Sequence, residues 1–165
     1  MKIHKANVSR NVEDEDLVRH RVSDIIAKVR KDGDRGLFEL NKSFDGYERE
    51  EVLVTPEEIK KAYAEINLTT LEDLRFAAKN IEEFAKRQKH ILQDIEEEIL
   101  PGVKLGHRVI PVEACAGYVP GGRYPLPSSA LMSIIPAKVA GVKRLVACSP
   151  KGKDLESIHP ATLVA

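Results

Sequence analysis

The residues of this chain best suited to bind a ligand lie in one loop, PGGRYPLPSS, at residues 120–129. The loop separates an apolar, strand-like segment that ends near Tyr118 from a helix-like run over residues 128–140. In α/β proteins, ligands bind beyond the carboxyl end of a strand, where glycine lets the backbone approach them and the N–H groups of a helix start attract anions. The loop therefore indicates a cofactor or phosphate site, with Tyr118 as its best-placed aromatic side chain.

Purely structural roles explain the same residues and stay open at this point. The loop matches neither G-x-G-x-x-G nor G-x-x-x-x-G-K-[ST], the two usual nucleotide-binding patterns. Pro120 and Gly121 could form the middle of a type II turn, and the serine pair 128–129 could cap the helix. As a nucleophile, either serine would need a nearby base, and the closest histidines in sequence, His107 and His159, lie outside the loop. Tyr118 could equally be a packed core residue.

Metal-binding and cysteine-based sites have little support in the sequence. The five histidines form no i, i+4 pair, and no CxxC or Cys/His metal spacing occurs. Cys115 and Cys148 lie in apolar, strand-like segments. Because the first residues do not resemble a secretory signal, we expect a cytoplasmic location and two free, buried thiols.

Charge and hydropathy give no support for two classes of partner. The chain has 26 basic and 26 acidic residues, so its net charge gives no reason to expect binding to nucleic acid or to an anionic membrane. No apolar run approaches the roughly 18 residues that a transmembrane helix needs. We therefore expect neither nucleic acid nor membrane as a partner.

The elements that position the loop are mainly helical before residue 101 and α/β after it. Helices are expected over residues 11–33, 34–43, 55–66 and 70–92, and a short strand over 51–54. Thr55 is the predicted cap of the third helix, with Pro56 at its first position. The longest helix has one apolar stripe, expected to pack in a core, which consists of Leu71, Leu74, Ala78, Ile81, Phe84 and Ala85. The charge run 96–98 is expected to face solvent.

The last third of the chain predicts the start of a parallel α/β sheet. Two extended segments over residues 103–119, broken near Pro111, precede the loop; a helix over 128–140 and a strand over 144–149 follow it. Pro136 inside that helix predicts a kink or a late helix start. A parallel crossover should join the strands. The expected fold is α/β, with a mainly helical region at 1–100 followed at 101–165 by the first part of an incomplete Rossmann-like βαβ domain.

The motifs around the loop resemble those of the histidinol dehydrogenase family. GYVPGGRYPLPSSALMSIIPAKVAGVKRLVACSP, at residues 117–150, is similar to its pattern of Tyr-(Val/Ile)-Pro-Gly-Gly, then Ser-(Ser/Thr)-x-Leu-Met, then Pro-Ala-(Lys/Arg)-x-Ala-Gly. Similar segments occur at 29–46, 77–88 and 101–122, so the resemblance covers nearly the whole chain. Two positions depart from the pattern: Ala85 replaces the usual His, and Ala116-Gly117 replaces Gly plus an apolar residue.

The resemblance implies an activity that this chain would share only in part. Family members oxidise L-histidinol to L-histidine through the aldehyde, a four-electron reaction of histidine biosynthesis that uses NAD and zinc. The family's zinc ligands and its catalytic Glu-His pair correspond to polypeptide beyond residue 165. The chain would then be the N-terminal portion of a longer, homodimeric enzyme and would be inactive alone, with no catalytic or metal-binding residue of its own.

The resemblance also implies roles for a few residues of the loop. Tyr118 matches a tyrosine that contacts NAD, and Pro120, Gly121 and Gly122 match the loop beneath the cofactor. Ser128 matches a serine that lies close to the active site.

Two other functions fit the sequence. One is a non-catalytic cofactor-binding or interaction module, which a stop codon directly after Ala165 would support and an open reading frame that continues would not. The other is an aldehyde-dehydrogenase-like oxidoreductase, which would need an exposed, reactive cysteine.

Overall fold

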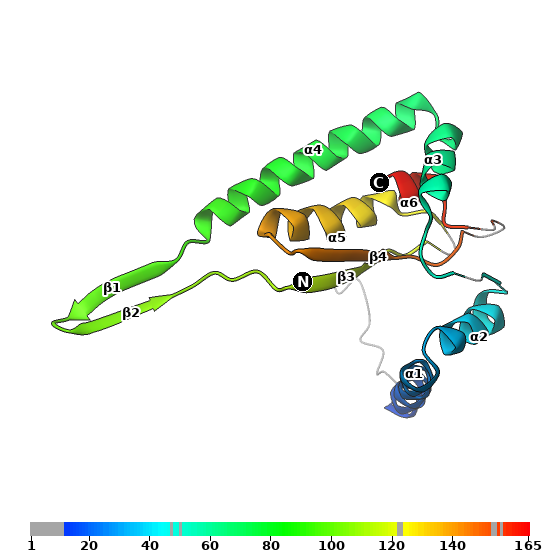
Figure 1. Cartoon of the computed structure of the whole chain (residues 1–165), viewed down its shortest axis with the longest axis horizontal. Coiled ribbons are helices and arrows are strands. Elements are labelled where there is room, and N and C mark those ends of the chain that lie inside the picture. Colours follow the sequence, from blue (N-terminus) through cyan, green and yellow to red (C-terminus); the bar gives the residue numbers. More distant parts are fainter. Residues whose placement is uncertain (1–11, 47, 50, 122–123, 153–154, 156) are drawn as a thin grey trace, which may run out of the picture. The chain divides into compact units, whose positions relative to one another are not determined.

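The computed structural model describes residues 12–46, 48–49, 51–121, 124–152, 155 and 157–165 (Figure 1). The chain divides into two compact units, Met1–Leu53 and Val54–Ala165. Each unit has its own packing and is described by itself.

The first unit is a helical hairpin. Helix α1 (Val12–Asp32) ends at Gly33, whose φ of 60° lies in the left-handed region that favours glycine, and α2 (Asp34–Asp45) follows directly. Gly36 lets the two helices approach, because a Cβ there would lie 3.2 Å from the carbonyl oxygen of Lys28. A left-handed Gly46 (φ 58°) caps α2, so the predicted stop at Gly33 is confirmed and α2 runs two residues past its predicted end.

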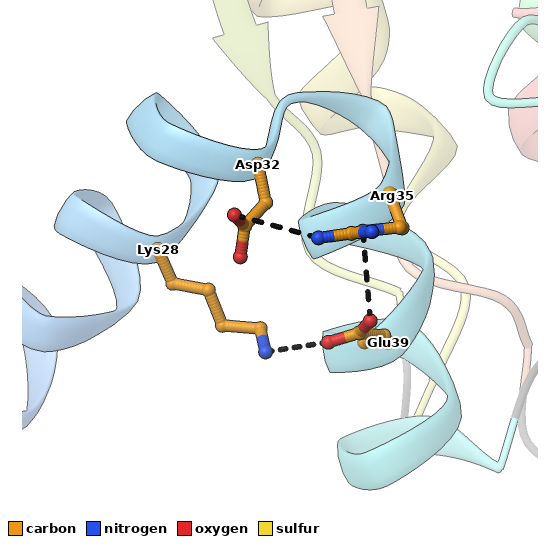
Figure 2. A network of polar contacts seen from close by, with 4 residues as sticks. All are labelled: Lys28, Asp32, Arg35 and Glu39. Carbon is orange, nitrogen blue, oxygen red and sulfur yellow. Dashed lines mark hydrogen bonds and ion pairs between the residues drawn. The ribbon is translucent and has the colours of Figure 1, made fainter.

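A small ionic network joins the two helices of this unit (Figure 2). Lys28 Nζ on α1 donates to Glu39 Oε2 on α2 at 2.6 Å. Arg35 lies between the acidic groups, 3.7 Å from Asp32 Oδ1 and 4.0 Å from Glu39 Oε1. The hydrogen bond and the charge of Lys28 lower the pKa of the Glu39 carboxyl, and the charge of Arg35 adds to the effect.

Glu39→Gln should lower the free energy of unfolding at neutral pH and have less effect in acid. Because the folded-state pKa of Glu39 lies below the ordinary value of 4.5, its stabilising contribution is present above that value and is lost as the pH falls through the folded pKa. The measurement is denaturant unfolding of both proteins from neutral pH to about pH 3, with the exposed Asp24→Asn as control. A difference between wild type and variant that stays constant over this range would contradict the assignment.

The second unit begins with two helices whose start signals are local. In α3 (Pro56–Glu65), the Thr55 hydroxyl accepts from the backbone N–H of Glu58 at 3.2 Å, and the Glu58 carboxylate accepts from the N–H of Thr55 at 2.8 Å. This capping box, with Pro56 in the first turn, confirms the predicted start. At the start of α4 (Leu68–Ile91) the Asn67 side chain accepts from the backbone N–H of Thr70 at 2.7 Å, a cap without a reciprocal bond. The strand predicted at 51–54 is wrong, because those residues form a bend and a coil with no pairing partner.

Two separate strand pairs follow α4. Strands β1 (Ile95–Leu100) and β2 (Val103–His107) form an antiparallel hairpin, and β3 (Ala114–Tyr118) pairs in parallel with β4 (Arg144–Cys148). Helix α5 (Pro127–Ala140) connects β3 to β4 and contacts both (Figure 1). The parallel βαβ unit confirms the predicted α/β fold, with the helical region before it.

The sequence predicted an extended segment from residue 103, which contains β2, but it missed β1 and therefore the hairpin. Its turn contains Gly102 at φ 79°, and the Gly102 N–H donates to Glu98 Oε1 at 2.8 Å. A Cβ at Gly106 would collide with the carbonyl oxygen of Ile95, so glycine is required where the strands meet. All residues of both strands are exposed, as predicted for the glutamates at 96–98.

The core of the second unit lies between α5, α4 and the parallel strands. Its buried apolar residues are Ala62, Ala85, Val119, Ala130, Leu131 and Ala161. Helix α4 packs along α5, and the short α6 (Pro160–Val164) packs against α3. Ala85, which replaces the family's usual histidine, is therefore a core residue.

Two predictions about these helices need correction. Phe84 is exposed rather than packed, although Leu71, Leu74, Ala78 and Ile81 are half-buried. Helix α5 begins at Pro127 and continues through Pro136, so a late start is excluded.

Because α4 packs on α5, the helices α3 and α4 before residue 101 and the α/β structure after it belong to one compact unit. A domain that begins at residue 101 stays a prediction.

None of the described helices combines the length and apolarity that a membrane span requires.

Candidate functional site

The candidate site lies at the carboxyl ends of the two parallel strands. Tyr118, the last residue of β3, is paired in register with Cys148, the last residue of β4. Both strands thus end at the same edge, and the N–H of Val119 extends the pairing by donating to the carbonyl of Cys148 at 2.7 Å. The loop that follows leads into α5, so strand ends, loop and helix start adjoin, as the sequence predicted (Figure 1).

Tyr118 and Val119 have opposite environments at this edge. Val119 is completely buried, whereas 68% of Tyr118 is exposed. Successive side chains of a strand point to opposite faces, so a buried Val119 anchors the end of β3 and turns the ring of Tyr118 outward. A core role for Tyr118 is therefore excluded within the described part of the chain.

Gly121 is required for close approach and not for its backbone angle. Its φ lies outside the positive range, so the type II turn considered for Pro120 and Gly121, which needs a left-handed second residue, is wrong. A Cβ at this position would lie 3.1 Å from Ser149 Oγ, a distance tighter than most real contacts. Pro120 is exposed and Gly121 half-buried, while Gly122 lies outside the described residues.

The start of α5 does not use serine as a cap. Leu126 occupies the N-cap position without a side-chain hydrogen bond, and Pro127 is the first helical residue. The prediction that Ser128 or Ser129 caps the helix is therefore wrong, because the chain enters the helix two residues earlier. Ser128 is exposed in the first turn, next to the candidate site in sequence.

The two cysteines differ from their predicted environments. Both are free, as expected, but Cys115 is only half-buried and Cys148 is exposed. The reason is that α5 covers one face of this two-stranded sheet: alternate residues of β3 are exposed, and in β4 every residue except Leu145 is exposed. Both thiols lie within strands and not in an exposed loop.

The two histidines nearest the loop in sequence make local hydrogen bonds. His107 Nε2 lies 3.0 Å from the carbonyl oxygen of Gln93, and His159 Nδ1 accepts from the N–H of Ala161 at 3.2 Å, where it caps α6. Among the residues that the structure describes, no three His, Cys, Asp or Glu side chains are grouped so that they could hold a metal ion.

A second hollow, of about 760 Å³, lies between α4 and the carboxyl-terminal half of α5. Two of its lysines have close partners. Lys86 pairs with Glu82 at 2.9 Å, and Lys89 donates to the carbonyl of Val139 at 2.8 Å. This groove is at the opposite end of α5 from the loop.

The parallel βαβ unit places the chain in the α/β class of proteins, in which ligands commonly bind beyond the carboxyl ends of the strands. Comparison of the sequence with known proteins identifies the family to which this chain belongs. A model of the family "Histidinol dehydrogenase" matches residues 8–165. The chain belongs to the histidinol dehydrogenase family.

Named relatives and a solved structure agree with this membership. The chain is 47% identical over 136 residues to histidinol dehydrogenase from Geobacillus kaustophilus, a match that covers 82% of this chain and 32% of the relative. It is 40% identical over 148 residues to sulfopropanediol 3-dehydrogenase from Ruegeria pomeroyi, over 90% of this chain and 34% of that one. The crystal structure of histidinol dehydrogenase from Elizabethkingia anophelis superposes with a TM-score of 0.81 and 28% identity, over 99% of this chain and 35% of that chain.

The chain therefore spans about a third of the length of the curated relatives it matches.

Ser149 is the residue of this edge that sequence reasoning missed. It directly follows β4, and the strand-end argument that selected Tyr118 applies to it equally. The sequence contains neither the strand register nor the fold of the loop, which together bring Ser149 close to Gly121.

Proposed function

We propose that this chain supplies one side of the dinucleotide pocket of an NAD-dependent dehydrogenase that oxidises L-histidinol. The observation that carries the proposal is the strand edge itself: Tyr118 is exposed at the end of β3, beside a loop where Gly121 packs directly on Ser149. Membership of the histidinol dehydrogenase family supports the reaction class. On this proposal Tyr118, Pro120, Gly121 and Gly122 contact the cofactor and Ser128 lies near the substrate.

The residues of the edge fit a dinucleotide. Tyr118 offers a broad apolar ring for stacking against a base, and the small residue at 121 leaves the backbone accessible. When bound, NAD supplies the hydride acceptor. This chain's own contribution is to orient the cofactor and to keep one side of it from water.

The described residues do not fit zinc, because they contain no suitable group of ligands. The proposal therefore assigns the metal ligands and the acid–base pair to polypeptide outside these 165 residues, and this chain takes part in no metal-dependent step.

A second substrate class is favoured by one finding. Sulfopropanediol 3-dehydrogenase, whose name states a different alcohol, is 40% identical to this chain, so family membership alone leaves the alcohol open. Both substrates are alcohols oxidised at carbon, and the groups that tell them apart would lie outside the strand edge described here.

Turnover by the complete gene product that contains these 165 residues distinguishes the two substrates. NADH formation is measured with L-histidinol and with sulfopropanediol, with zinc present. We expect faster turnover of L-histidinol. If only sulfopropanediol is oxidised, L-histidinol is not the substrate and the second substrate replaces it in the proposal.

The 165-residue chain by itself is expected to reduce no NAD with either alcohol, since it lacks the acid–base pair. Measurable turnover by the isolated chain would contradict the proposal that the acid–base pair and the metal ligands lie outside these 165 residues.

The proposal extends to assembly and location. Exposed apolar residues of the β1–β2 hairpin, among them Ile99, Leu100 and Leu105, support contact with further polypeptide or with a second copy in a homodimer. We propose a cytoplasmic location, and L-histidinol as the small-molecule partner.

A further inference from the structure

We infer that Ser149 is a further cofactor-binding residue, whose hydroxyl hydrogen-bonds an oxygen of the ribose–pyrophosphate backbone of the dinucleotide. The inference rests on the proposed function and names a residue that the family resemblance did not supply.

Position is the first argument. Ser149 is the first residue after β4, and Gly121 follows β3 by three residues. The two lie across the shared strand edge, with Ser149 Oγ 3.1 Å from the point that a Gly121 Cβ would occupy. No side chain of residue 121 stands between the hydroxyl and the loop.

The face of the sheet is the second argument. Gly117 faces α5, because a Cβ there would lie 3.1 Å from Ser133 Cβ of that helix. Alternation then directs Tyr118 to the other face and Val119 back toward α5, and the register places Ser149 opposite Val119. Tyr118 and Ser149 therefore flank the strand edge from its two faces. A ligand that contacts both must be long enough to cross the edge, as a dinucleotide is.

Chemistry is the third argument. The hydroxyl of Ser149 is half-buried and donates to the carbonyl of Pro150 at 3.3 Å, well beyond the usual 2.7–2.8 Å for an O–H···O bond. Such a long bond to the next residue contributes little, so exchanging it for a ligand oxygen costs little. A serine hydroxyl both donates and accepts, which suits either a phosphate oxygen or a ribose hydroxyl.

The test is the affinity of the complete gene product that contains these 165 residues for NAD, ADP-ribose and adenosine, measured by titration. Ser149→Ala should weaken NAD and ADP-ribose by about 2- to 10-fold, the usual effect of one lost hydrogen bond. An equal loss with adenosine would assign the bond to the adenosine ribose, and an unchanged affinity for adenosine would assign it to the pyrophosphate or the second ribose. The matched control is Ser43→Ala, an exposed serine of α2.

Two further variants separate binding from folding. Ser149→Thr keeps the hydroxyl and should retain the affinity for NAD that Ser149→Ala loses. Gly121→Ala should lower the thermal midpoint, and Ser149→Ala in the same chain should restore part of it by removing the contacted Oγ.

The outcomes distinguish this inference from the proposed function. If wild type binds NAD and Tyr118→Ala weakens it while Ser149→Ala does not, the role of Ser149 is wrong and the pocket stands. If wild type binds neither NAD nor ADP-ribose, the proposed function fails and this inference fails with it.

Discussion

Tyr118→Ala should weaken NAD binding by roughly 5- to 150-fold, the largest functional effect expected of a single substitution in this chain. Stacking of a base on an aromatic ring contributes about 1–3 kcal/mol, which converts directly into this range of Kd. The ring is exposed at the end of β3, so its removal costs little packing and leaves Val119 to anchor the strand. Tyr118→Phe keeps the stacking face and should stay within about threefold of wild type.

The measurement is a titration of the folded chain with NAD, and the control is Tyr63→Ala, which removes a partly exposed tyrosine of helix α3. If removal of the Tyr118 ring leaves the Kd for NAD unchanged, Tyr118 does not bind the cofactor, whatever the effect of substitutions in the rest of the loop.

Leu131→Ala should lower the free energy of unfolding by about 2–5 kcal/mol, the largest effect expected on stability. Leu131 is only 2% exposed in the second turn of α5, where it lies between the helix and its neighbours. Truncation removes buried apolar surface and leaves a cavity that packed neighbours fill only in part. Because α5 also leads out of the loop, the same variant should weaken NAD binding through a less ordered strand edge.

Denaturant unfolding measures this effect, and the neighbouring Met132→Ala is its control. Met132 is 57% exposed, so its truncation should change stability by no more than about 0.5 kcal/mol. Equal losses for the two variants would show that α5 does not carry the core of this unit.

The helices and the βαβ unit follow from local patterns in the sequence. Thr55 and Pro56 fix the start of α3 through contacts within one turn, and Gly33 ends α1 because its backbone angle favours glycine. Apolar periodicity placed α4 within two residues of its first residue and one of its last. These signals depend on near neighbours alone, so sequence reasoning finds them.

Strand β1, and with it the pairing of the β1–β2 hairpin, was missed because the hairpin has no buried face, whereas β2 lies within the extended segment predicted from residue 103. With every residue of both strands exposed, the alternation that normally reveals a strand is absent, and the glutamates at 96–98 give no apolar signal. The remaining cue was Pro101-Gly102, a turn pair whose glycine does adopt a positive φ.

The site was predictable in part, for a related reason. Strand-end reasoning selected Tyr118, but its partner across the edge depends on register, which pairs Tyr118 with Cys148 and places Ser149 one residue further. Cys148 was predicted to be buried because an apolar strand was expected to be covered on both faces. In the structure α5 covers only one face, and Cys148 is exposed.

The most direct test of the central claim is a map of where NAD binds on the 165-residue chain. Backbone amide shifts are followed by NMR during titration with NAD, and the strand edge is compared with the β1–β2 hairpin and the groove beside Lys86 and Lys89. We expect the largest shifts at residues 117–121 and 147–149, with little change in the hairpin or the groove. Shifts concentrated away from the ends of β3 and β4, or none at saturating NAD, would contradict the claim that this edge is one side of a dinucleotide pocket.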